Sequence, residues 1–175
     1  IAFDLTPYAL AAIGGAMAVR LFARQELTRT IAWAVLGFGL LFLGLGLMQT
    51  ALEPFRESEQ LHEAMALIST RTFAGMLLGI LLSMIATSVM MSSGAMIALT
   101  FALAQVGLIE NFEQAFPILL GAHIGTTVLA LFGAIGASAN AKRAALAHLL
   151  FNAGGTVVAL CLMQVYLTVI PQTSD

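Results

Sequence analysis

The sequence predicts an all-α integral membrane protein, and three observations carry that prediction. The 175-residue chain is 60% hydrophobic and has only 9% charged residues, whereas soluble domains carry about 25%. Its mean hydropathy is +0.98. The stretch of residues 72–109 contains no charged residue at all. A spanning helix needs about 20 apolar residues, and the chain supplies several windows that approach or exceed this length.

Apolar windows, charge-free except for Arg20 in the first, give the expected helices in order along the chain. They cover residues 7–22, 31–52, 72–90, 93–109, 116–136 and 144–170, and Pro171 stops the last one. Trp33 lies near one end of the second window, where a Trp is typical of the membrane interface. Arg20 and Arg24 close the first window, and their long side chains can reach the interface.

A charged connector covers residues 53–71. Leu61, Met65 and Ile68 recur there at helical spacing between charged positions. This pattern predicts a short amphipathic helix at the membrane surface. An ordinary exposed loop is the alternative.

The basic residues orient the chain in the membrane. Five of the seven lie in two connections that share one side when the crossings are counted: Arg20, Arg24, Arg29, Lys142 and Arg143. That side is predicted to be cytoplasmic. The charged connector and the loop of residues 110–116 then face outward.

The central pair of windows allows two arrangements, which are two full spans or a re-entrant hairpin entered from outside. A cytoplasmic turn between full spans usually carries Lys or Arg. Residues 90–95 carry neither. A hairpin tip buried inside protein needs no such anchor, so the pattern favours the hairpin.

Two polar clusters interrupt the apolar segments. The first covers residues 87–94, and the second covers residues 121–127 inside the fifth window. Protein, water or a ligand must satisfy backbone and hydroxyl groups at membrane depth, because lipid cannot. Two interrupted segments in a short membrane protein are typical of a solute-binding site. We therefore predict transport, with a broken helix at the second cluster.

The chemistry available at the clusters is mostly neutral. Neither residues 72–109 nor residues 116–136 contain Lys, Arg, Asp or Glu, so a site must use neutral groups or His123. Backbone N–H groups at broken helix ends favour an anion. Hydroxyls add donors for an anion, or oxygens for a sodium ion. An anion and a cation bound together each lower the electrostatic cost of burying the other, which is a physical basis for ion coupling.

Helix packing is the competing interpretation of these residues. Ser, Thr and Gly are common where membrane helices approach closely. His123 is a candidate functional group because it is ionisable at membrane depth, although a neutral His bonded to a carbonyl is the alternative. His148 and Asn152 share a helix face and are interpreted first as interhelical hydrogen-bonding groups. Cys161, the single cysteine, excludes an internal disulfide.

At these clusters the sequence resembles the sodium/phosphate cotransporter family. The family's QSSS-type motif corresponds to MSSGA at residues 91–95, and its GANIGTT-type motif corresponds to GAHIGTT at residues 121–127. Residues 36–45 and 142–152 are also similar to family segments, so that the resemblance covers residues 36–165. Three polar positions depart from the motifs, since Met91 replaces Gln, Gly94 replaces Ser and His123 replaces Asn.

The resemblance implies two inverted repeats, each with a re-entrant hairpin and a broken helix. The chain is similar to the second repeat. We expect one transmembrane domain over residues 1–175, with residues 1–35 as a preceding helix and linker and residues 36–170 as one repeat of a longer protein. Site residues follow from the motifs and the clusters. Candidate substrate ligands are Ser92, Ser93, His123, Gly125, Thr126 and Thr127, and candidate ion ligands are Thr87, Ser88, Ser92, Thr126 and Asn152.

The function that we expect is sodium-coupled symport of inorganic phosphate, by a multi-pass protein of the plasma membrane or bacterial inner membrane. Its partners are phosphate, sodium, the bilayer, and the missing repeat or a partner subunit. We expect no other cofactor. The absence of a basic tract argues against nucleic acid, and no catalytic arrangement indicates an enzyme. The alternatives are another solute or proton coupling through His123, or a membrane subunit that does not transport.

Overall fold

The protein is helical throughout the part of the chain that the structure describes. The computed structural model describes the backbone of residues 6–169 and the side chains of residues 8–163. Its elements are α1 (Thr6–Phe22), α2 (Glu26–Leu52), the 3-10 turn η1 (Glu53–Phe55), α3 (Glu59–Ala66), α4 (Phe73–Met90), α5 (Ser93–Gln105), α6 (Phe112–Gly133) and α7 (Ala139–Val169). The predicted all-α class is confirmed.

Four helical segments within the described residues are long and apolar enough to cross a membrane. They are Glu26–Phe55, Phe73–Met90, Phe112–Gly133 and Ala139–Met163. The protein is therefore an integral membrane protein. The predicted end of the last helix, at Ile170 and Pro171, lies outside the described residues.

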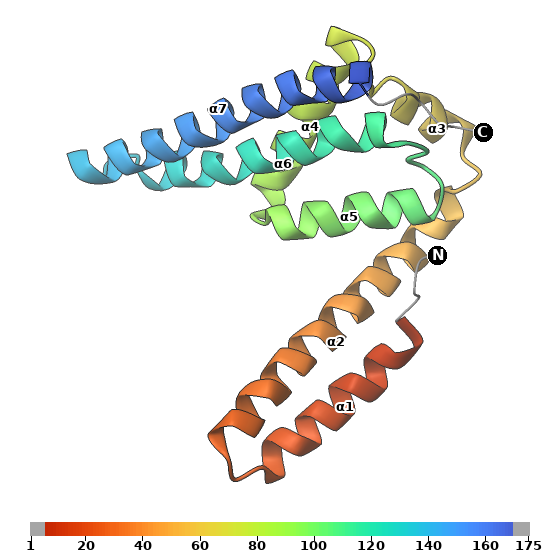
Figure 1. Cartoon of the computed structure of the whole chain (residues 1–175), viewed down its shortest axis with the longest axis vertical. Coiled ribbons are helices and arrows are strands. Elements are labelled where there is room, and N and C mark those ends of the chain that lie inside the picture. The colour runs from red at the N-terminus through yellow and green to blue at the C-terminus, as the bar shows by residue number, and fades with distance from the viewer. Residues whose placement is uncertain (1–5, 170–175) are drawn as a thin grey trace.

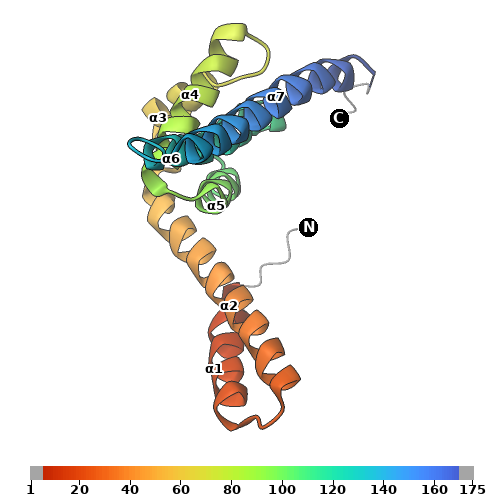
Figure 2. The same ribbon diagram turned by 90° about the vertical axis from the view of Figure 1, so that its left-hand side faces the viewer.

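The helices form two parts. Helices α1 and α2 make an antiparallel hairpin that extends away from the other helices, as both views show (Figures 1 and 2). In the second part, α7 runs alongside α6, while α4 has its most extensive contact with α6 (Figure 1). Helix α5 packs against both α6 and α2, and so joins the two parts.

Side-chain caps define where three helices begin. Thr72 accepts a hydrogen bond from the Gly75 N–H at 3.1 Å and starts α4. Ser92 accepts one from the Ala95 N–H at 3.1 Å and starts α5. Asn111 accepts one from the Gln114 N–H at 3.1 Å and starts α6. Each cap satisfies an N–H group that the helix itself leaves without a partner.

Small residues line the contact between α4 and α6. On α4 they recur every four residues at Gly79, Ser83 and Thr87, and on α6 at Pro117, Gly121 and Gly125; all are buried. A Cβ added to Gly125 would lie 2.7 Å from the Met84 carbonyl oxygen and 2.7 Å from Thr87 Cβ. The two backbones therefore approach so closely that only glycine fits there.

This close contact corrects the prediction of a broken helix at residues 121–127. Helix α6 is continuous from Phe112 to Gly133, so the prediction was wrong. Gly121 and Gly125 are four residues apart, which puts both on the face toward α4. The glycines there permit helix packing, and they do not end the helix.

The helices on either side of the first polar cluster differ in length. Met90 ends α4, Met91 adopts a left-handed conformation with φ 55°, and Ser93 begins α5. Helix α5 has 13 residues and therefore rises about 20 Å. That is shorter than the hydrocarbon core of about 30 Å. Helix α5 is therefore too short to cross the hydrocarbon core, which the arrangement with two full spans would require.

The connector before α4 contains the predicted amphipathic helix. Helix α3 covers Glu59–Ala66, with Leu61 and Met65 half-buried. Ile68, just after it, is buried in a core cluster with Met96, Ile109, Ile118 and Ala122. The connector therefore packs against α5, α6 and the loop between them through Met65 and Ile68, two of the three apolar positions that predicted the helix.

Candidate solute-binding site

The end of α4 and the middle of α6 bring parts of the two polar clusters together. The Ser88 hydroxyl donates to the Met84 carbonyl at 2.7 Å, and it also lies 3.2 Å from the Gly125 carbonyl oxygen of α6. Thr87 is fully buried, and its Cβ faces Gly125. These contacts join residues of the first cluster to the second cluster across the α4–α6 contact.

Thr87 shares one property with Thr70 and Thr156. Its hydroxyl oxygen is buried and has no hydrogen-bond partner among the described residues. Leaving a buried hydroxyl without a partner costs about 1–3 kcal/mol. A bound water or ion would supply the missing partner.

The start of α5 presents hydrogen-bond donors. The Ser92 oxygen accepts from the Ala95 N–H, so its own proton remains available to donate. Ser93 is half-buried at the first position of the helix, and Gly94 beside it is exposed. A Cβ at Gly94 would meet only the Ser92 oxygen, at 3.8 Å. The backbone at Gly94 is therefore open to approach, while the Ala95 N–H is capped by Ser92, and a helix start favours negative charge.

In contrast to the Ser92 hydroxyl, the two threonine hydroxyls of α6 already donate their protons to carbonyl groups of their own helix. Thr126 donates to the Ala122 carbonyl at 2.9 Å, and Thr127 donates to the Ile124 carbonyl at 2.7 Å. Their protons are engaged within the helix, so each oxygen can only accept a further contact. Oxygens of this kind suit a cation such as sodium more than an anion.

The remaining candidates lie apart from these groups. His123 is on α6 and is exposed, so that it points away from the buried α4–α6 contact. Asn152 on α7 donates to the His148 carbonyl at 2.9 Å within its own helix. Within the described residues, no hydrogen bond joins Ser92 or Ser93 to Thr126 or Thr127. The structure thus connects Thr87 and Ser88 with Gly125, and it leaves the other candidates as separate groups.

Sequence reasoning missed two polar contacts between helices. The buried Ser83 hydroxyl donates to the Ile118 carbonyl across the α4–α6 contact. The Gln49 and Gln105 side chains form a hydrogen bond that ties α2 to the end of α5. The four-residue spacing from Gly79 to Thr87 is a signal that could have revealed the first contact. The sequence has no local signal for the second, since its partners are 56 positions apart.

Comparison with known proteins decides the family. The sequence model of the Na+/Pi-cotransporter family matches residues 55–171. The chain belongs to the Na+/Pi-cotransporter family. The resemblance carried by the two motifs is confirmed, and it is a family of transporters and not of enzymes.

Several curated relatives of this Na+/Pi-cotransporter family member are similar over part of their length. "Uncharacterized protein YqeW" of Bacillus subtilis (strain 168) is 30% identical over 130 residues, which are 70% of this chain and 40% of that protein. "Putative inorganic phosphate export protein YjbB" of Escherichia coli (strain K12) is 30% identical over 125 residues, which are 71% of this chain and 22% of that protein.

A rat protein extends the comparison to animals. "Sodium-dependent phosphate transport protein 2C" of Rattus norvegicus is 38% identical over 76 residues, which are 41% of this chain and 12% of that protein. The matched part of the chain therefore covers 40% or less of the length of each of these relatives. No solved structure matches it.

Proposed function

We propose that the chain is one repeat of a sodium-coupled symporter for inorganic phosphate in a plasma or bacterial inner membrane. In this proposal residues 36–170 form the repeat, α4 and α5 form a re-entrant hairpin, and the solute binds between the hairpin turn and α6. Family membership supports phosphate as the solute. The length of α5, which is too short to span, supports the hairpin.

The observation that carries the proposal is the separation of donors from acceptors. The start of α5 offers the Ser92 hydroxyl proton and the N–H group of the exposed Gly94. The α4–α6 contact offers the Thr87 hydroxyl oxygen, which has no partner among the described residues, and the Gly125 carbonyl that the Ser88 hydroxyl contacts. An anion suits the first set and a cation suits the second. Coupled binding of phosphate and sodium requires one site that prefers an anion and another that prefers a cation.

The relatives' names support the same substrate. One is named for phosphate export and another for sodium-dependent phosphate transport. We propose sodium as the coupling ion because the Thr87 oxygen requires a partner that can be a cation. The opposite repeat, or a partner subunit, would complete the site at the exposed Gly94.

Uptake into proteoliposomes tests the proposal. The full-length protein that carries this repeat should accumulate labelled phosphate when an inward sodium gradient is imposed. It should not do so when potassium replaces sodium on both sides. Phosphate uptake that is the same with and without sodium would reject the sodium coupling, and no uptake together with no phosphate-dependent thermal stabilisation would favour a subunit that does not transport.

A glycine variant tests the anion end of the site. Gly94→Ala has room for its methyl group, so the fold should be retained. The methyl group would crowd the N–H groups at the start of α5, and we expect the KM for phosphate to rise. Gly155→Ala on α7 is the matched control, because no atom lies within 4 Å of its added Cβ. Equal KM values for the two variants would remove the anion site from the start of α5.

Proton coupling through His123 is the second candidate. The side chain is exposed on α6, one helical turn before Thr127, where a second repeat could reach it. Imidazole exchanges its proton near neutral pH. If this candidate holds, uptake should follow a proton gradient without sodium, and His123→Asn should abolish that dependence. An unchanged pH profile in His123→Asn would exclude it.

A further inference from the structure

A groove runs along the α1–α2 hairpin, outside the candidate solute site. Its volume is about 360 Å³, and among the residues that line it only Thr28 is polar. The walls include Ala12, Gly15 and Val19 of α1 and Thr28, Ile31 and Val35 of α2. Gly15, Ile31 and Val35 are exposed, so the groove is open to the surroundings of the hairpin. In a membrane, those surroundings are lipid chains or a further protein helix.

The groove has dimensions that suit one acyl chain. Small residues keep it free, since no atom lies within 4 Å of a Cβ added to Gly15. Its wall on α1 extends from Ala12 to Val19, which is a rise of about 10 Å along the helix. One leaflet of the hydrocarbon core is about 15 Å thick. The groove can therefore hold most of an acyl chain that lies parallel to the two helices.

One end of the groove lies at the basic turn of the hairpin. Val19 and Thr28 are the lining residues nearest to the turn between α1 and α2. Three arginines lie at this turn or within one helical turn of it, and they are Arg20, Arg24 and Arg29. Glu26 is the only acidic residue in residues 5–52. The positive-inside pattern predicts that this end faces the cytoplasm, where the leaflet carries anionic lipids.

The three arginines differ in their protein partners. The Arg20 guanidinium carbon lies 3.8 Å from the centroid of the Trp33 ring. Arg29 lies 3.8 Å from the Glu26 carboxylate, and both of these side chains are at least half exposed. Arg24 is exposed and has no carboxylate partner among the described residues. A guanidinium presents a planar fork of donors that matches a phosphate group, so Arg24 and Arg29 are available to an anion from outside the protein.

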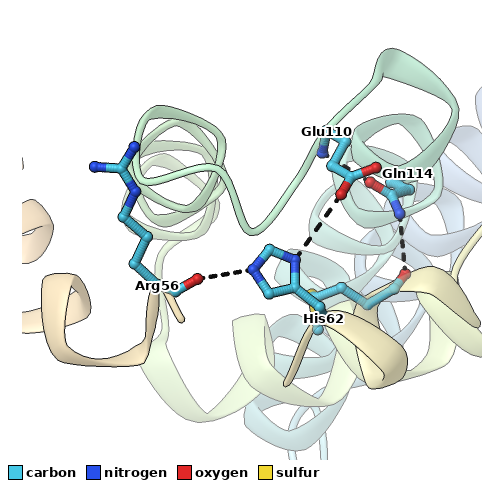
Figure 3. Close-up of polar contacts among 5 residues, drawn as sticks. Arg56, His62, Glu110 and Gln114 are labelled. Atoms are coloured by element: carbon cyan, nitrogen blue, oxygen red, sulfur yellow. Dashed lines mark hydrogen bonds and ion pairs between the residues drawn. The ribbon is translucent and has the colours of Figure 1, made fainter. Parts of the chain in front are cut away.

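The charged connector differs from this turn, because protein groups engage its polar side chains. The Arg56 guanidinium pairs with Glu53 at 3.5 Å. Figure 3 shows His62 of α3, whose Nε2 lies 2.8 Å from the Arg56 carbonyl oxygen and whose Nδ1 lies 3.9 Å from the Glu110 carboxylate. Arg56 therefore offers a comparison for Arg24, since the two carry the same charge and only Arg56 has a carboxylate partner.

We propose that the groove and the basic turn together bind one acidic phospholipid of the cytoplasmic leaflet. One acyl chain lies in the groove, and the phosphate contacts Arg24 and Arg29. The bilayer is as apolar as the groove, so the groove adds packing and position but little hydrophobic free energy. The preference for an acidic lipid comes from the arginines, which repel the choline of a zwitterionic headgroup. The proposal does not rest on the proposed function, because no candidate solute ligand lines the groove.

Native mass spectrometry of the full-length protein in detergent micelles tests the preference. The protein is titrated with dioleoyl phosphatidylglycerol and, separately, with dioleoyl phosphatidylcholine. We expect the affinity for phosphatidylglycerol to exceed that for phosphatidylcholine at least about fivefold, since one basic residue near an anionic surface contributes about that factor. Equal affinities would overturn the proposal. Glycerol phosphate has no acyl chain and should not displace the lipid, and displacement would overturn the proposal in favour of a site for soluble anions.

An arginine variant tests the headgroup contact. Arg24→Gln should lower the ratio of the two affinities by about fivefold. Arg56→Gln changes the formal charge by the same amount in the connector, and it should leave the ratio unchanged. An equal fall in both variants would show that the lipid responds only to the overall charge of the protein, and the proposal would then be wrong.

A glycine variant tests the groove. Gly15→Leu places a side chain in the groove and should bring the ratio of the two affinities close to one. Gly14→Leu is the matched control, because Gly14 also has open space around an added Cβ but does not line the groove. Equal ratios in the two variants would overturn the proposal. So would a loss of the fold in Gly15→Leu, seen by circular dichroism, together with an unchanged ratio in Arg24→Gln, because a protein helix would then fill the groove.

Discussion

The α4–α6 contact and the α1–α2 hairpin are both glycine-rich helix pairs, yet they pack differently. In α4–α6, a Cβ at Gly79, Gly121 or Gly125 would overlap the partner helix. In α1–α2, Gly14, Gly15, Gly37 and Gly44 have no atom within 4 Å of an added Cβ, and Gly39 is tight. A cavity of about 360 Å³ remains along that hairpin, lined in part by Gly15 and Ala16.

The difference teaches that the number of glycines does not set how closely two helices approach. In α4–α6 the small residues face each other at four-residue spacing on both helices, and two serine hydroxyls reach across to carbonyl groups of α6. At the open glycines of α1–α2, no atom of the partner helix lies within 4 Å of an added Cβ. Four experiments test this comparison, from the largest expected effect to the smallest.

Gly121→Ala should give the largest loss of stability. Its methyl group would overlap the Ile80 carbonyl oxygen and lie 2.8 Å from Ser83 Cβ. Forcing the helices apart should lower the free energy of unfolding by about 1–3 kcal/mol, as measured by denaturant titration in detergent micelles. The control is Gly15→Ala on α1, which has open space and should be neutral or stabilising by about 0.5–1 kcal/mol. Equal effects would contradict the close α4–α6 contact.

Thr87→Val tests whether Thr87 binds sodium or only packs in the α4–α6 contact. The valine keeps the shape and removes a buried hydroxyl that has no partner among the described residues, so stability without sodium should be unchanged or higher. Sodium at ten times its dissociation constant stabilises a binding protein by about 1.4 kcal/mol, and the variant should lose this gain. The measurement is thermal unfolding in sodium and in potassium.

Thr100→Val is the control for Thr87→Val. Its hydroxyl bonds to the Met96 carbonyl within α5 at 2.8 Å, so the variant should keep the sodium response. A full sodium response in Thr87→Val would show that Thr87 is a packing residue only.

Ser83→Ala removes the hydrogen bond from α4 to the Ile118 carbonyl. Hydrogen bonds between membrane helices contribute about 0.6 kcal/mol on average, and we expect a loss of this size in the same denaturant titration. Thr30→Ala on α2 is the control, since its exposed hydroxyl bonds only to the Glu26 carbonyl of its own helix. A greater loss in Thr30→Ala would contradict the special role of the α4–α6 contact.

Trp33→Leu should have a small and local effect on the α1–α2 hairpin. The Arg20 guanidinium carbon lies 3.8 Å from the centroid of a Trp33 ring, and an exposed contact of this kind contributes about 0.5–1 kcal/mol. Hydrogen exchange should become faster in α1 and α2 and stay the same in α4 and α6. Phe22→Leu, an exposed aromatic residue in the same hairpin, should leave both regions unchanged.

The sequence allowed the helices to be predicted well, and the reason is physical. Membrane helices bury long apolar windows, so the ends of residues 7–22 and 72–90 fall within one residue of α1 and α4. The connector helix followed from Leu61, Met65 and Ile68 at helical spacing. The site was predicted less well, because the glycines at 121 and 125 have the same appearance in sequence whether they end a helix or face a neighbour. Here they face α4.

Composition and the order of apolar windows were enough to determine that this is a helical membrane protein, and two short motifs were enough to indicate its family. These properties depend on local hydrophobicity and on residues that are adjacent in the chain. Only the tertiary structure decided that α6 is unbroken, that Thr87 lies buried against Gly125, and that His62 meets Glu110. Those features depend on which helix faces which, and such contacts join residues 38 to 48 positions apart that no local pattern connects.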